Sequence, residues 1–206
     1  MFEKKVLETF YHKAESPEDL PWHSTEPARL LVDAIKRRGK PGKALDIGCG
    51  TGVYSVYLAK QGYEVTGLDF IPKALEMAEK RRRMENVKIN WVQADLLDWQ
   101  TSERFDLILD SATLHTVRAG KMRRYKEQVL SWLASDADFI LAHWGRRHLL
   151  DWRPIGPRRR TRRILVRFFS PELREAAYES KIETGVLFPI GPVVLTQCFW
   201  FQRAAS

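Results

Sequence analysis

The sequence predicts an α/β fold in which a seven-stranded, mostly parallel sheet carries helices on both faces and ends in an antiparallel hairpin. Short apolar runs alternate with helical patterns through the first 145 residues, which is the spacing of βαβ units. A glycine-rich turn directly follows the first of these runs. The last two apolar runs are joined by a segment that contains Pro and Gly, and this favours a terminal hairpin.

The individual elements follow from hydrophobic periodicity. An amphipathic start with Phe2, Val6, Leu7 and Phe10 predicts a helix, and a second helix ends at Gly39. Further helices are predicted at residues 53–61, 72–83 and 118–134, and a short one opens at Ser170-Pro171-Glu172 and runs to about Tyr178. Strands are predicted at residues 43–47, 63–69, 87–95, 105–111 and 137–144, with the hairpin at 181–188 and 193–201.

The positive charge of the chain is concentrated in one segment. The net charge is +8, but residues 145–163 hold eight arginines and one acid and supply +7 of it. The eight are Arg146, Arg147, Arg153, Arg158, Arg159, Arg160, Arg162 and Arg163. The basicity is therefore local, and it weakens the argument for a nucleic-acid partner that total charge would suggest.

Composition also limits the setting of the protein. Two cysteines, Cys49 and Cys198, are too few for a disulfide framework and lack the spacing of metal ligands. The N-terminal residues carry acids without an apolar core, and no run is long enough to cross a membrane. We expect a cytoplasmic protein with no metal site.

Two aspartates accompany the glycine turn Gly48-Cys49-Gly50-Thr51-Gly52. Asp69 ends the second predicted strand, where a carboxylate can accept both hydroxyl protons of a ribose. Asp95 ends the third, where it could meet the exocyclic amine of adenine. The spacing G-x-G-x-G is shorter than the dinucleotide fingerprint G-x-G-x-x-G. The three features together predict an adenosine-binding site.

These motifs, taken in order, resemble those of class I S-adenosylmethionine-dependent methyltransferases. The resemblance rests on ALDIGCGTG, VTGLD, VQAD and FDLILDSATLHTV and covers roughly residues 20 to 203. It implies a Rossmann-like fold and one methyltransferase domain over residues 1–206. Residues 1–24 would supply an N-terminal helix and lid, and residues 145–163 an Arg-rich insertion. The Pro-Trp at residues 21–22 and the D-S-x-x-x-H element are most similar to the thiopurine and tellurite-resistance branch.

The resemblance also implies how the cofactor S-adenosylmethionine is bound before it leaves as S-adenosylhomocysteine. Gly48 and Gly50, with Cys49 between them, would pass close to the methionine portion, and Asp46 would organise the turn. Asp69 would bind the ribose. Phe70 and Ile71 would pack near the adenine, whose amine Asp95 would take beside the Leu96 backbone. Ser111 would face the sulfonium.

Candidate acceptor residues lie near the ends of the fourth and fifth strands, where ligands bind in such sheets. His115 could act as a catalytic base or orient the acceptor, or it could simply fill a turn. His143 and Trp144 end the fifth strand, and a buried structural histidine is the alternative for His143. Trp22 could close over the cofactor with His23 nearby, or it could pack the first helix onto the core. The arginines could bind an anionic substrate or remain a solvated loop.

The leading hypothesis is therefore an enzyme that methylates a small acceptor by direct displacement at a thiol, another soft nucleophile or a hydroxyl. One alternative is an RNA or protein methyltransferase that docks through residues 158–163. Another is a non-catalytic regulatory protein that binds the cofactor.

Overall fold

The computed structural model describes residues 2–148, 151, 158–184 and 193–204. Its strands form one sheet in the order β3-β2-β1-β4-β5-β7-β6. The bounds are β1 Lys43–Ile47, β2 Glu64–Asp69, β3 Ile89–Gln93, β4 Phe105–Ser111, β5 Leu133–Gly145, β6 Leu173–Thr184 and β7 Val193–Arg203. The first five strands are parallel to one another, and β7 pairs antiparallel with both β5 and β6. The predicted fold class is confirmed.

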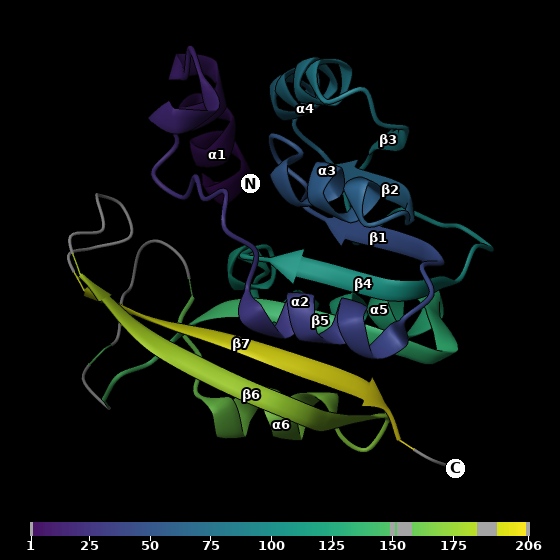
Figure 1. Cartoon of the computed structure of the whole chain (residues 1–206). Coiled ribbons are helices and arrows are strands. Elements are labelled where there is room, and N and C mark those ends of the chain that lie inside the picture. Colours follow the sequence, from purple (N-terminus) through teal and green to yellow (C-terminus); the bar gives the residue numbers. More distant parts are fainter. Residues whose placement is uncertain (1, 149–150, 152–157, 185–192, 205–206) are drawn as a thin grey trace.

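Helices cover both faces of this sheet (Figure 1). The helices are α1 Phe2–Lys13, α2 Arg29–Arg38, α3 Val53–Lys60, α4 Pro72–Met84, α5 Met122–Trp132 and α6 Arg162–Phe169. Buried side chains of α2 and α3 pack on one face, for example Leu31 and Leu58 against Leu109. Those of α5 and α6 pack on the other, for example Val129 and Phe169. Parallel sheets bury both faces in this way, which explains the continuous apolar runs of β1, β4 and β5.

One secondary-structure prediction is wrong. The short helix expected from Ser170 to about Tyr178 is absent, because β6 begins at Leu173 and pairs with β7 along its whole length. The run Glu172–Ala177 contains good helix formers, but the ladder with β7 outweighs that local preference. The final helix lies earlier, at α6, where the Thr161 hydroxyl accepts the Ile164 amide. Arg162 and Arg163 therefore belong to this helix, and the loop of the predicted insertion ends before them.

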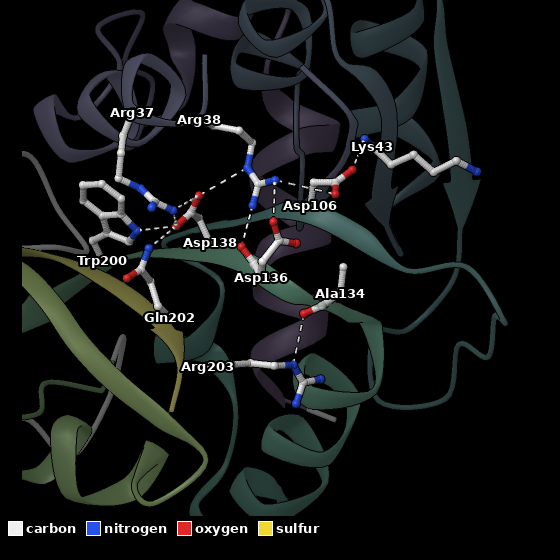
Figure 2. A network of polar contacts seen from close by, with 10 residues as sticks. All are labelled: Arg37, Arg38, Lys43, Asp106, Ala134, Asp136, Asp138, Trp200, Gln202 and Arg203. Carbon is white, nitrogen blue, oxygen red and sulfur yellow. Dashed lines mark hydrogen bonds and ion pairs between the residues drawn. The ribbon is translucent and has the colours of Figure 1, made fainter. Parts of the chain in front are cut away.

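A polar network fixes α2 to the sheet at the end remote from the glycine turn (Figure 2). Asp138 is fully buried in β5 and accepts hydrogen bonds from Trp200 Nε1 at 2.8 Å and Gln202 Nε2 at 2.9 Å. Arg37 and Arg38, at the end of α2, bind the same carboxylate at 2.9 and 3.3 Å. This buried charge is thus compensated from two elements, and it ties α2 to β5 and β7.

Candidate active site

The glycine turn joins β1 to α3 with a backbone that a larger residue would disturb. Gly48 has φ +64° and Gly50 has φ +54°, conformations that L side chains rarely adopt. A Cβ at Gly48 would overlap the Thr113 hydroxyl, and one at Gly50 would lie 2.8 Å from the Tyr11 hydroxyl. The turn therefore lies directly under side chains from the β4–α5 connection and from α1.

The amides of this turn are already used inside the protein. Gly48 N and Cys49 N both donate to the Leu68 carbonyl, at 2.7 and 3.1 Å, and Gly50 N donates to Asp69 Oδ2 at 2.9 Å. A pyrophosphate cradle needs such amides to face the ligand. The turn consequently suits a ligand without phosphate, which favours S-adenosylmethionine over a dinucleotide.

Asp46 and Asp69 are both buried at this edge of the sheet. Asp46 accepts the Ser55 hydroxyl at 2.6 Å, and burial raises the pKa of Asp46 to about 7. Asp69 accepts amides from Gly50 and Ile71, each at 2.9 Å. Burial also raises the pKa of Asp69, although these two bonds partly oppose the shift. Asp69 thus lies at the end of β2, bonded to the glycine turn.

Asp95 lies two residues beyond the end of β3. Its carboxylate accepts the Leu97 amide at 2.9 Å and forms an ion pair with Lys4 of α1. Burial alone would raise the pKa of Asp95, but these two partners bring it below its usual value. The Lys4 ammonium also lies 4.8 Å from the centre of the Phe70 ring. Asp95 and Phe70 therefore border one region, which α1 also reaches. The partly buried Leu96 packs against the core, and its carbonyl accepts the Gln128 side-chain amide at 3.0 Å.

Trp22 packs against two aromatic rings of α1. Its ring centre lies 5.4 Å from that of Phe10 and 5.9 Å from that of Tyr11. Trp22 and its neighbour His23 also line a cavity of about 660 Å³ beside the end of β4. Trp22 therefore packs against α1 and also lines the cavity, so packing of the first helix and a role as a lid are compatible.

The cavity lies between the loop of residues 21–28, the ends of β4 and β5, the start of α3 and the β6–β7 pair. The loop of residues 21–28 forms one wall, and Ser111 and Ala142 lie at the neighbouring ends of β4 and β5. Ala142 is the register partner of Ser111 on one side and of Cys198 on the other, so the three lie at one level of the sheet. Tyr54, in the first turn of α3, lines the cavity and connects it to the glycine turn.

The three predicted acceptor residues His115, His143 and Trp144 come together. The His115 ring stacks on Trp144 with centres 4.1 Å apart and lies 5.6 Å from that of His143. His143 and Trp144 line the cavity, whereas His115 is buried behind Trp144 and is not among the described lining residues. Burial lowers the pKa of His115 to about 3 and that of His143 well below its usual value, and Arg160 adds to both effects. Both rings are therefore neutral at physiological pH.

Several arginines of the Arg-rich segment bind parts of the protein itself. Arg147 and Arg159 pair with the buried Asp151 at 3.0 and 2.7 Å. Arg160 donates to the carbonyls of Leu114 and Val117, at 3.5 and 3.3 Å. Within the part of the chain that the structure describes, none of the eight lines the cavity. Arg153 lies outside the described residues.

Four residues of this region were not predicted: Lys4, Tyr11, Tyr54 and Thr113. Tyr54 carries the one signal that the sequence offers, because it opens the helix directly after the glycine turn. Lys4 and Tyr11 approach from a helix more than 35 residues away in the chain, and no local pattern indicates that contact. Among the described residues, no cluster of three His, Cys, Asp or Glu side chains could hold a metal ion.

Comparison with known proteins identifies the family. A family model described as a methyltransferase domain matches residues 44–136. A ubiquinone biosynthesis O-methyltransferase of Azorhizobium caulinodans is 30% identical over 193 residues, which cover 82% of this chain and 76% of that protein. The chain belongs to the S-adenosylmethionine-dependent methyltransferase family. The predicted family is therefore confirmed, and S-adenosylmethionine is the cofactor of that family.

Other curated relatives match over shorter segments, whereas a solved structure matches nearly the whole chain. A 2-heptyl-1-hydroxyquinolin-4(1H)-one methyltransferase of Mycobacteroides abscessus is 28% identical over 138 residues, which cover 63% of this chain and 60% of the relative. The matches to the next two curated relatives cover only 37% and 41% of their lengths. A solved structure from work on the conversion of a disulfide bond into a thioacetal group in echinomycin biosynthesis is 25% identical. It has a TM-score of 0.76 and covers 97% of this methyltransferase and 91% of its own chain.

Proposed function

We propose that the protein transfers the methyl group of S-adenosylmethionine to a small molecule bound in the cavity beside Ser111. The cavity carries this proposal, because its volume of about 660 Å³ suits a small ligand and it adjoins the glycine turn through Tyr54. The two relatives described above that act on small molecules support the same class of acceptor.

The residues of the turn fit the cofactor in the following arrangement. The glycines with Cys49 and Asp46 hold its methionine side, Asp69 accepts the ribose hydroxyls, and Phe70, Asp95 and Leu96 contact the adenine. Ser111 then lies at the sulfonium end and Trp22 closes the site. When bound, the cofactor supplies an electrophilic methyl group attached to a sulfonium. A nucleophile in the cavity would form a bond to the methyl carbon while the carbon–sulfur bond breaks, and the bonding electrons would leave with sulfur as the neutral thioether S-adenosylhomocysteine.

The chain contributes mainly by positioning the acceptor and excluding water. His115 remains our candidate base, although it is buried behind Trp144 and does not line the cavity, so proton transfer from an acceptor would require the Trp144 ring to move aside. Because its pKa is about 3, the His115 imidazole holds a proton poorly at neutral pH and is a weak base. This favours a thiol or another nucleophile that ionises readily over an alcohol. The relative involved in disulfide-to-thioacetal conversion also points to sulfur chemistry.

The alternatives gain less support. Docking of RNA or protein through residues 158–163 would require free arginines, whereas Arg159, Arg160 and Arg162 contact the protein itself. No helix within the described residues is long and apolar enough to cross a membrane. We also propose a cytoplasmic setting, on the basis of two buried free cysteines.

Incubation with cofactor labelled in its methyl group tests the proposal, with small thiols, phenols and total RNA offered separately. We expect label in a thiol or a phenol, and label only in RNA would contradict the proposal. Tight cofactor binding without turnover of any acceptor would favour a regulatory protein. An Ala142→Phe variant should bind the cofactor normally yet lose turnover, because the new ring fills the cavity. Ala176→Phe places the same ring on the exposed edge strand and serves as the control.

A further inference from the structure

Lys4, a surface residue of α1, contacts two residues that the proposed function assigns to the cofactor. Its ammonium pairs with Asp95 and lies 4.8 Å from the centre of the Phe70 ring. Asp95 and Phe70 are two of the residues that contact the adenine in the proposed function. A protonated amine therefore already lies against the carboxylate that is expected to accept the exocyclic amine of the cofactor.

The rest of α1 reinforces this contact. Tyr11, two turns further along, is buried with its hydroxyl against Gly50, at the other end of the predicted adenosine site. Tyr11 and Ala14 pack with Ile71 and Ala74 of the β2–α4 region in one apolar cluster. The helix is thus held over the site by apolar packing near its C-terminal end and by the Lys4 ion pair near its N-terminal end.

We propose that the Lys4–Asp95 ion pair is a latch that competes with the cofactor. One oxygen of the Asp95 carboxylate accepts the Leu97 amide, and the other binds the Lys4 ammonium, which also lies beside the Phe70 ring. The ammonium thus takes the position at Asp95 and Phe70 that the adenine amine needs, so the cofactor binds by exchange and the latch lowers its affinity. Lys4 is then a residue of the cofactor site that sets affinity and takes no part in methyl transfer. This inference rests on the proposed function.

The size of the effect follows from the exposure of the pair. The Lys4 side chain is 48% exposed and that of Asp95 is 24% exposed. Ion pairs of this kind contribute little, and their loss corresponds to about a two- to fivefold change in an equilibrium constant. Such pairs also weaken as salt is added.

Calorimetric titration with S-adenosylhomocysteine tests the latch. We expect Lys4→Met to bind about two- to fivefold more tightly than the wild type. Lys5→Met removes a neighbouring exposed charge of the same helix and should leave affinity unchanged. Raising the salt concentration should bring the wild type closer to Lys4→Met. Equal or weaker binding by Lys4→Met would overturn the inference.

A second background shows whether the effect acts through Asp95. In an Asp95→Ala protein the Lys4→Met substitution should no longer change the affinity, because the latch has lost its partner. An undiminished gain in that background would overturn the inference, although the proposed function would stand. Absence of binding by every variant would overturn the proposed function and this inference with it.

Discussion

The substitution Gly48→Ala separates two demands on the glycine turn, backbone conformation and space. Gly48 has φ +64°, so an alanine there costs about 1–2 kcal/mol in conformational strain. The new Cβ would also overlap the Thr113 hydroxyl and lie 3.1 Å from both Thr113 carbons. Overpacking of this kind adds about 1–3 kcal/mol. We therefore expect Gly48→Ala to lower the free energy of unfolding by about 2–5 kcal/mol, the sum of these two ranges.

Gly39 provides a matched control for the strain alone. It has φ +67° at the end of α2, and a Cβ there would meet nothing within 4 Å. Strain alone should therefore lower the free energy of unfolding of Gly39→Ala, by about 1–2 kcal/mol. This variant should bind the cofactor normally. Urea unfolding measures both losses, and titration with S-adenosylhomocysteine measures binding, which Gly48→Ala should weaken strongly.

A Thr113→Ala substitution in the Gly48→Ala background should recover part of the lost stability, since it removes the two overlapping atoms beyond Cβ. Recovery stays incomplete because the hydrogen bond from Thr113 Oγ1 to the Ile47 carbonyl, 2.9 Å long, is lost as well. Equal destabilisation by Gly48→Ala and Gly39→Ala would refute the steric argument.

Three further substitutions test the account. Asp138→Ala should lower the free energy of unfolding in urea by about 3–5 kcal/mol, because it leaves the Arg38 side chain and other buried donors without their acceptor. The control Asp136→Ala removes a carboxylate that is 79% exposed and should lower it little. Equal losses for the two variants would contradict the buried network. Folding raises the pKa of Asp46 to about 7, so its stabilising contribution is lost as pH rises from about 4 through 7. Asp46→Asn should flatten the pH dependence of the unfolding free energy between about pH 4 and 7. An unchanged profile would contradict a raised Asp46 pKa. Asp69→Asn should weaken S-adenosylhomocysteine binding by about tenfold or more in calorimetry, and retained affinity would remove Asp69 from the site.

Periodicity and strand-end position predicted much of the fold, and strand-end position also selected the candidate cofactor residues. Asp69 and Asp95 lie at or just beyond the ends of neighbouring parallel strands, so both could be assigned to one edge of the sheet without any knowledge of loop geometry. The predicted hairpin strand at 181–188 includes the last four residues of β6, and its residues 185–188 lie outside the described residues. The first part of β6 was missed because helix formers in residues 172–177 gave a local signal that only the pairing with distant β7 overrides.

Contacts between remote segments could not be predicted from local pattern. The stacking of His115 on Trp144 depends on how the connection after β4 folds against the end of β5. The Lys4–Asp95 pair depends on the placement of α1, which pattern alone does not determine. The Arg-rich segment was identified from composition. Its ion pairs, Arg159 with Asp151 and Arg162 with Glu175, depend on how β6 and the end of β5 are positioned, which composition does not give.

A crystal structure of the complex with S-adenosylhomocysteine would test the central claim most directly. The account predicts ribose hydroxyls on Asp69, adenine between Phe70 and Asp95 in place of the Lys4 ammonium, and a sulfur atom facing the cavity beside Ser111. A ligand bound away from the glycine turn, or one whose sulfur is sealed off from that cavity, would contradict methyl transfer at this site.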